Sequence, residues 1–258
     1  MQRAVQLPAA FLHAPLAHRA FHDAGAGRPE NSRAATRAAV TAGYGIEVDI
    51  QPSADGVPMV FHDYDLRRLT GRAGRTRSLT ATELGALPLL NGSEGIPTLA
   101  EILAIVVGQV PLLIEIKDQD GGMGPDVGPL EYAVAKALIG YAGPVALMSL
   151  NPHSVAALAA AAPHLPRGLT TSAYLAEGWP LLPAPAREHL CAIPDFERTG
   201  SSFISHDVAD LDNPRVAELK ARGARVLCWT VRSPEAEAKA RRVAENITFE
   251  GYPAVVPA

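Results

Sequence analysis

The sequence predicts an α/β fold built on a mainly parallel sheet. Strand-like and helix-like patterns alternate from one end of the chain to the other, as they do when helices link parallel strands. The length of 258 residues suits an α/β barrel folded as one domain. Candidate polar residues also follow the carboxyl ends of strands, where such barrels carry their sites. We therefore expect a TIM-type (β/α)8 barrel, rather than an open sheet, and assign residues 1–258 to a single domain.

The first half of the chain supplies four candidate strands and two candidate helices. An apolar run at residues 7–17 resembles a signal peptide, but His13 and Pro15 interrupt it and it leads directly into His18. We interpret this run as the approach to the first strand, and the chain as uncleaved. Thr98 followed by Glu101 is a capping-box pattern that predicts a helix start. The expected strands cover residues 14–18, 45–50, 57–61 and 112–116, and the expected helices cover 31–42 and 98–107.

The second half continues the alternation and brings the strand count close to the number that a barrel needs. The strand at 168–171 is weakly marked, and the one at 247–249 would close the sheet. The expected strands cover residues 145–148, 168–171, 203–205, 225–230 and 247–249, and the expected helices cover 130–139, 152–161, 213–221 and 234–244.

Two segments predict a departure from a regular barrel. Asp55-Gly56 between the strands at 45–50 and 57–61 is a hairpin signal, and no helix separates these strands. The barrel should therefore be irregular between its second and third strands, either because this pair is antiparallel or because a crossover helix is missing. Residues 66–95, rich in Arg, Thr and Gly, predict a long loop with one short helix over the mouth of the sheet.

Composition narrows the class of protein. The chain is 48% hydrophobic and 19% charged, which is typical of a globular protein. Its net charge of −4 gives no support for nucleic-acid binding. No run approaches the roughly 18 apolar residues of a membrane span. Cys191 and Cys228 lie far apart in apolar surroundings, so we expect reduced thiols and a cytoplasmic location.

Three carboxylates stand inside apolar strands. Glu47 and Asp49 are two residues apart and therefore share one face of a strand, and Glu115 lies in a similar strand. A buried ionised carboxylate is costly unless a partner or a metal compensates it. With no cysteine or ligand-spaced histidine nearby, the three residues favour Mg²⁺ or Ca²⁺ over zinc. Pairing with arginine side chains is the alternative.

Two histidines follow strand ends and each precedes a charged residue. Next to a bound cation, His18 and His62 could form an acid–base pair, one neutral and one protonated. The alternative for each is a hydrogen-bonded core histidine. Arg19 and Lys117 add positive charge at the same edge of the sheet, which suits an anionic substrate and a phosphoester first.

Other polar residues near these motifs have structural interpretations. We expect Asp63 to cap or anchor the loop that follows it. Glu30 and Asn31 are either helix caps or site residues, and Trp229 either packs in the core or lines the substrate site. We expect the arginines at 67, 68, 72, 75 and 77 to brace the loop or face solvent, and the histidines at 13, 22, 153, 164, 189 and 206 to be structural or surface residues.

Taken in order, the motifs resemble the glycerophosphodiester phosphodiesterase family over essentially the whole chain. Each motif is weak by itself, but the ordered set is specific. Trp229-Thr230-Val231 is similar to the family's last strand region, which carries an aromatic residue. The matching motifs are His18-Arg19, Pro29-Glu30-Asn31-Ser32, Glu47-Val48-Asp49, Asp55-Gly56, His62-Asp63, Leu69-Thr70-Gly71, Ile96-Pro97-Thr98-Leu99 and Glu115-Ile116-Lys117.

The resemblance implies a TIM barrel that hydrolyses glycerophosphodiesters to sn-glycerol 3-phosphate and an alcohol. It implies one divalent cation, Mg²⁺ or Ca²⁺ with Mn²⁺ as a further candidate, bound by Glu47, Asp49 and Glu115. His18 and His62 would be the catalytic acid and base. The implied substrate-binding residues are Arg19, Glu30, Lys117 and Trp229, with Glu30 orienting or charge-balancing the His18 region.

The chain departs from the family pattern in four places, one of which is a longer loop at residues 24–28 before Pro29. Ala20 replaces the glycine usual after His-Arg, which affects backbone freedom near the phosphate. Ser149-Leu150 replaces the usual Ser-Phe, and Thr248-Phe249-Glu250-Gly251-Tyr252-Pro253 replaces the usual Thr-Asp-x-Pro ending. The last two departures bear on substrate preference more than on the reaction.

Three other functions stay open. A lysophospholipase D-type enzyme would need an apolar mouth, for which Trp179-Pro180-Leu181-Leu182 is the candidate segment. A sugar isomerase or aldolase barrel would need Lys117 to act on a carbonyl. A non-catalytic barrel could bind a phosphorylated ligand. We expect a small-molecule glycerophosphodiester as the partner, with no nucleic acid and no stable membrane insertion; the sequence leaves the oligomeric state open.

Overall fold

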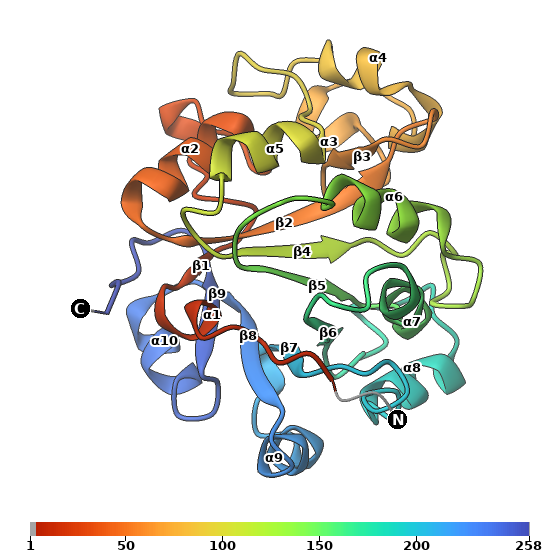
Figure 1. Ribbon diagram of the computed structural model, residues 1–258, viewed down its shortest axis with the longest axis vertical. Helices are drawn as coiled ribbons and strands as arrows, with labels where there is room; N and C mark the ends of the chain where they lie inside the picture. The colour runs from red at the N-terminus through yellow and green to blue at the C-terminus, as the bar shows by residue number, and fades with distance from the viewer. Residues whose placement is uncertain (1–3, 258) are drawn as a thin grey trace.

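Eight parallel strands close into a barrel in the part of the chain that the computed structural model describes, residues 4–257 (Figure 1). β1 (Leu16–Ala17) closes the ring by pairing with both β2 (Gly45–Pro52) and β9 (Asn246–Phe249). The predicted TIM-type barrel is therefore confirmed. The remaining parallel strands follow in chain order: β4 (Leu112–Ile116), β5 (Val145–Ser149), β6 (Arg167–Thr171), β7 (Phe203–Asp207) and β8 (Arg225–Val231).

The irregularity between the second and third strand runs is an antiparallel hairpin. β3 (Pro58–Val60) pairs antiparallel with the end of β2, with Ile50 opposite Val60. Gly56 in the connecting turn has φ +76°, a conformation that glycine adopts without strain. The hairpin predicted from Asp55-Gly56 is thus confirmed. β3 is an additional strand that pairs with the end of β2 outside the ring.

The predicted helices are present and surround the strands (Figure 1). The first of them begins two residues later than expected, because the Ser32 hydroxyl, not Asn31, caps it by accepting from the Ala35 amide. The predicted capping box of Thr98 and Glu101 is confirmed. These helices are α2 (Arg33–Ala42), α5 (Leu99–Val106), α6 (Pro129–Ala137), α7 (Pro152–Ala161), α9 (Pro214–Ala221) and α10 (Pro234–Ala240).

Several elements were not expected from the sequence. α8 (Ala184–Cys191) buries only Leu190, so it lacks the apolar stripe that marks a helix in sequence. The insertion at 66–95 holds two short α-helices instead of one, α3 (Arg67–Thr70) and α4 (Ala81–Gly85), with a 3₁₀ turn η2 (Thr76–Ser78) between them. It packs on Met59 and Phe61 through an apolar cluster of its own. The remaining short turns are α1 (Ala10–His13), η1 (Ala24–Ala26) and η3 (Val208–Asp210).

Alternation along the strands separates the outer core from the barrel interior. Ile46, Val48 and Ile50 on β2 belong to the large core under the helices, so Glu47 and Asp49 between them point into the barrel. Leu113 lies beside Glu47 in the sheet register and belongs to a smaller apolar cluster with Phe11 and residues of β5, β7 and β8. The barrel interior therefore has an apolar floor, above which acidic side chains are placed.

Two expectations from composition can be compared with the structure. Cys191 and Cys228 are free thiols, as expected. None of the helices between residues 4 and 257 is long and apolar enough to cross a membrane.

Candidate active site

A cavity of about 650 Å³ opens at the carboxyl ends of the barrel strands. Parallel barrels place their sites at this end, because loops of variable sequence follow every strand there. The cavity is lined by eight of the nine predicted site residues: His18, Arg19, Glu47, Asp49, His62, Glu115, Lys117 and Trp229. The structure therefore brings these eight residues together in one cavity, whereas Glu30 does not line it.

The three predicted carboxylates converge inside this cavity. Glu47 and Asp49 come from β2 and Glu115 from β4, and the strand register places Asp49 beside Glu115. One oxygen from each carboxylate lies within 4.8 Å of the others, and all three side chains are buried. With this spacing and only oxygen donors, the three carboxylates could hold a hard divalent cation.

The backbone after β1 is shaped around Glu47. Arg19 has φ +52°, and its amide donates to Glu47 Oε2 at 2.9 Å. Ala20, in the place of the usual glycine, also lies in the left-handed region at φ +65°, and its amide donates to the Glu47 carbonyl. This strained conformation turns two successive amides toward Glu47.

Positive charge is distributed unevenly over the three carboxylates. Lys117 Nζ lies 2.7 Å from Glu115 Oε1 and 3.3 Å from Asp49 Oδ1. Burial alone would raise the pKa of Asp49, but the charges of Lys117, His62 and Arg19 outweigh it and hold that pKa below its ordinary value. Burial, followed by the charges of Asp49 and Glu115, raises the pKa of Glu47 well above its ordinary value. The cluster thus holds more negative charge than its cations offset.

Asn31 supports Asp49 and does not cap α2. Its side-chain amide donates to Asp49 Oδ2 at 2.9 Å, while its oxygen accepts from the Asp49 backbone amide at 3.3 Å. Asn31 has φ +55°, a conformation that asparagine tolerates better than most residues. The paired contact fixes the orientation of the Asp49 carboxylate.

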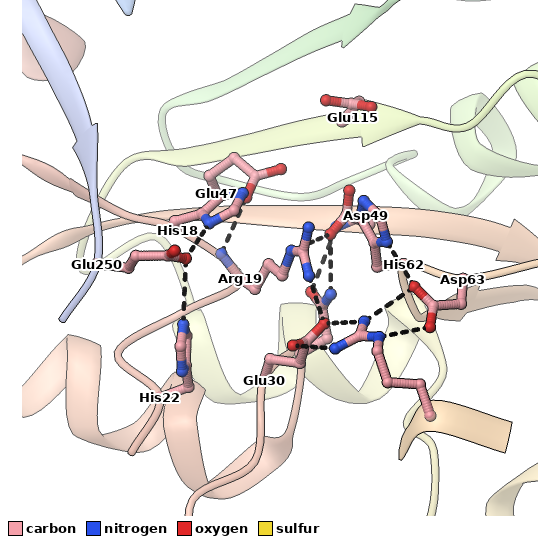
Figure 2. A network of polar contacts seen from close by, with 12 residues as sticks. His18, Arg19, His22, Glu30, Glu47, Asp49, His62, Asp63, Glu115 and Glu250 are labelled. Atoms are coloured by element: carbon pink, nitrogen blue, oxygen red, sulfur yellow. Dashed lines mark hydrogen bonds and ion pairs between the residues drawn. The ribbon is translucent and has the colours of Figure 1, made fainter. Parts of the chain in front are cut away.

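Each predicted catalytic histidine is held by a carboxylate at Nδ1. His18 Nδ1 lies 2.5 Å from Glu250 Oε2, and His62 Nδ1 lies 2.7 Å from Asp63 Oδ1 (Figure 2). A carboxylate at Nδ1 selects the tautomer that carries its proton there, which leaves Nε2 free for proton transfer. Burial lowers the pKa of His18 despite the opposing hydrogen bond with Glu250.

These contacts change two expectations. Asp63 anchors the following loop through Arg68, as expected, but it also binds the ring of His62. Glu250 was part of a sequence departure to which no role was assigned. The adjacency of His62 and Asp63 could have suggested their contact; Glu250 lies 232 residues from His18 and gave no such signal.

Glu30 lies behind the cavity in a network of ion pairs. Its carboxylate accepts from Arg19 Nη1 at 2.7 Å and from Arg68 at 2.8 Å, and Arg68 also reaches Asp63 at 2.7 Å. Glu30 therefore contacts the cavity through Arg19 (Figure 2). Its role in orienting or charge-balancing the His18 region stays a prediction.

Aromatic side chains form part of the cavity wall. Trp229 is half-buried, and its indole N–H donates to the Ser205 carbonyl at 3.0 Å. Trp179 lines the opening as well, together with Met123 and Leu150. Of the two positions expected for Trp229, the structure favours the wall of the cavity.

Comparison with known proteins agrees with this geometry. The profile of the "Glycerophosphoryl diester phosphodiesterase family" matches residues 18–246. The chain belongs to this family. A "Glycerophosphodiester phosphodiesterase" of Caldanaerobacter subterraneus subsp. tengcongensis is 32% identical over 161 residues, which are 58% of this chain and 65% of that protein. Human "Glycerophosphodiester phosphodiesterase 1" is 39% identical over 99 residues, 34% of this chain and 29% of that protein. The matches thus span less than two thirds of these relatives.

Solved structures of the family share the barrel over nearly its whole length. A phosphodiesterase of Oleispira antarctica, solved in complex with the product sn-glycerol-3-phosphate, superposes with a TM-score of 0.77 at 25% identity and covers 95% of both chains. A putative glycerophosphoryl diester phosphodiesterase from Silicibacter pomeroyi superposes with a TM-score of 0.74 at 20% identity and 93% coverage of both chains. The second likeness concerns the fold alone.

Proposed function

We propose that this protein hydrolyses glycerophosphodiesters to sn-glycerol 3-phosphate and an alcohol, with one divalent cation and a pair of histidines. The observation that carries the proposal is the convergence of three buried carboxylates in one cavity with two carboxylate-held histidines. The product named for the Oleispira antarctica phosphodiesterase supports the same substrate class. We further propose that residues 1–258 act as one catalytic domain.

The donor set fits a divalent cation. Glu47, Asp49 and Glu115 offer only oxygen atoms, which suits Mg²⁺, Ca²⁺ or Mn²⁺. Burial first, and then the negative charges of Asp49 and Glu115, raise the pKa of Glu47, and a bound cation would offset the repulsion among the three carboxylates. When bound, the cation would supply positive charge for the phosphate oxygens and would acidify a coordinated hydroxyl.

His18 and His62 would move the protons. The glycerol 2-hydroxyl attacks phosphorus, one histidine takes its proton, and the other gives a proton to the oxygen of the departing alcohol. Water then opens the cyclic phosphate, and each ring returns to its starting state by moving one proton in the opposite direction. Glu250 and Asp63 would keep Nδ1 of each ring occupied, so that Nε2 serves both steps.

Arg19 and Lys117 would bind the phosphate. Both line the cavity, and both keep their charge. Burial acts to lower the pKa of Lys117, but Glu115 and Asp49 outweigh it and raise that pKa above its ordinary value. A lysine held in its protonated form is unsuited to attack a carbonyl, which argues against the aldolase alternative.

A lysophospholipid substrate is the second candidate, supported by the loop that follows β6. This loop lines a second cavity of about 570 Å³ with Trp179, Pro180, Leu181 and Leu182, and Leu181 is 91% exposed. Trp179 and Met123 line both this cavity and the first. An apolar wall beside the active site suits the acyl chain of a lysophospholipid.

Product analysis tests both candidates. The purified protein would be incubated with glycerophosphodiesters that differ in the alcohol, and with lysophospholipids of the same headgroups. The proposal predicts release of sn-glycerol 3-phosphate from the first set. Faster cleavage of the second set, with the acylated glycerol phosphate as product, would favour the lipid-directed enzyme. Cleavage of neither set would contradict the proposed function.

A further inference from the structure

Glu250 connects the active-site residue His18 to a third, smaller cavity. His18 lines the active-site cavity. Glu250 and His22 line a separate cavity of about 430 Å³ beside the segment that follows β9. The contact between His18 and Glu250 therefore joins residues that line two different cavities.

The backbone fixes the position of Glu250 relative to His18. The amide of His18 donates to the carbonyl of Phe249 at 2.9 Å, which continues the pairing of β1 with β9. The amide of Glu250 donates to the carbonyl of Val231 at 3.0 Å. Each residue thus directly follows one of two adjacent strands and is fixed there by a backbone hydrogen bond.

The two carboxylate oxygens of Glu250 have different partners. Oε2 lies 2.5 Å from His18 Nδ1, whereas Oε1 accepts from Arg232 Nε at 2.8 Å. His22 approaches Oε2 from the other side, with its Nε2 at 3.6 Å, beyond hydrogen-bond distance (Figure 2). Arg232 thus holds the carboxylate in the orientation in which it contacts His18. The Glu250 side chain is 20% exposed and the His18 side chain 13%.

We infer that Glu250 is a positioning residue for His18, an inference that rests on the proposed hydrolysis. Its carboxylate keeps the His18 proton on Nδ1 and directs Nε2 to the reacting oxygen. When Nε2 takes a proton in one half of the reaction, the imidazolium lies beside a carboxylate that stabilises its charge. The proton that Nε2 has taken leaves again from Nε2 in the other half, while Nδ1 keeps its own proton. Glu250 itself is therefore not protonated.

The inference assigns a role to a segment where this chain departs from its family. Thr248-Phe249-Glu250-Gly251-Tyr252-Pro253 stands in place of a Thr-Asp-x-Pro ending. The segment supplies an acid that reaches His18 directly. The altered segment therefore still supplies a carboxylate that holds His18, one of the two proposed acid–base residues.

The test combines kinetics with NMR of the imidazole nitrogens. For Glu250→Ala we expect kcat to fall between about 10- and 1000-fold with KM within about threefold, since acid–base catalysis is worth about 10²–10⁴ in rate. Spectra of ¹⁵N-labelled wild type should show His18 protonated at Nδ1, with the assignment made from His18→Ala. In Glu250→Gln, whose amide oxygen can still accept, this signal should persist; in Glu250→Ala it should shift or vanish.

His22→Ala is the matched control, because it removes the other histidine near the same oxygen and leaves the bond between Glu250 and His18 intact. It should keep kcat within about threefold and leave the His18 signal unchanged. Three results would overturn the inference: wild-type kcat in Glu250→Ala, a His18 ring protonated only at Nε2 in wild type, or equal losses in His22→Ala and Glu250→Ala. If Glu250→Ala does not fold, the wild-type spectrum decides alone: a His18 ring protonated only at Nε2 overturns the inference.

The two proposals fail in different ways. If wild type hydrolyses no glycerophosphodiester, the proposed function is wrong, and the NMR result still decides whether Glu250 holds His18. If wild type is active and Glu250→Ala equals it, only the inference about Glu250 is wrong.

Discussion

The ammonium group of Lys117, the residue that directly follows β4, donates to the carboxylate of Glu115 near the end of that strand at 2.7 Å. A lysine and a carboxylate at this spacing lie on one face of a strand, so both enter the barrel interior. Lys117 thereby shares the space in which a divalent cation would bind. Its charge balances part of the acidic cluster and competes with the cation for it.

This relationship predicts the effect of Lys117→Met. Removing a positive charge from beside two of the proposed cation ligands should raise the affinity for Mg²⁺ by at least about tenfold, while kcat/KM falls because the proposed phosphate contact is lost. The cation-free variant should lose about 3–5 kcal/mol of stability, since buried carboxylates lose their partner. Calorimetric titration and thermal melts measure both effects. Lys136→Met on the exposed side of α6 is the control; a weaker Mg²⁺ affinity in Lys117→Met would speak against the assignment.

His62→Ala separates an enzyme from a phospho-ligand-binding barrel. We expect turnover to drop by about 10²–10⁴-fold, because one of two proton-transfer groups is lost. Affinity for sn-glycerol 3-phosphate should stay within about threefold, since the carboxylates, Arg19 and Lys117 remain. Initial rates and product titration measure the two quantities, with exposed His164→Ala as control. If turnover in His62→Ala equals that of wild type, His62 is not a proton-transfer residue.

Asn31→Ala tests the support of Asp49. The Asp49 carboxylate loses an amide donor at 2.9 Å, and loss of such an orienting contact typically lowers metal affinity about 10- to 100-fold. Ser32→Ala is the neighbouring control: it removes the cap of α2 and should cost about 1 kcal/mol of stability with unchanged cation affinity. Equal cation affinity in both variants would show that Asn31 does not orient Asp49.

The network around Arg68 predicts how stability depends on pH. Burial acts to raise the pKa of Asp63 and of Glu30, but hydrogen bonds from His62 and Arg68 to Asp63, and from Arg68 and Arg19 to Glu30, outweigh it and lower both. Carboxyls with lowered pKa values stabilise the fold above their ordinary values, about pH 4, and this stability is lost as pH falls through the folded values.

Arg68→Ala should therefore destabilise the protein by about 1 kcal/mol at pH 7, a modest figure because Arg68 is 48% exposed and screened by water. The difference from wild type should shrink below about pH 4, as both carboxyls become protonated. Urea unfolding at several pH values measures it. A difference that stays constant down to pH 2 would rule out these ion pairs as its origin.

Local sequence patterns were sufficient for the barrel because each strand and each helix carries its own signal. The two-residue period of Glu47 and Asp49 gave their shared face, and Asp55-Gly56 gave the hairpin to β3. α8 was missed because only Leu190 of that helix is buried, so tertiary contacts and not an apolar stripe maintain it. The same holds for the short helices in the insertion at 66–95.

The candidate site divides in the same way. Residues that follow strand ends could be assigned to one cavity, since parallel strands end at the same edge. The side chains that hold them could not: the contact of Glu250 with His18 depends on the closure of the barrel between β1 and β9, and that of Arg68 with Glu30 on how the insertion folds back. The separation of these residues along the chain does not show that they lie in contact.

Release of sn-glycerol 3-phosphate from a glycerophosphodiester, measured with EDTA and then with Mg²⁺, Ca²⁺ or Mn²⁺ added back, tests most directly whether Glu47, Asp49 and Glu115 form a working cation site. We predict that EDTA abolishes release, that at least one of the three cations restores it, and that Glu47→Gln prevents the restoration. Release at an unchanged rate in EDTA would contradict the cation site and the mechanism built on it.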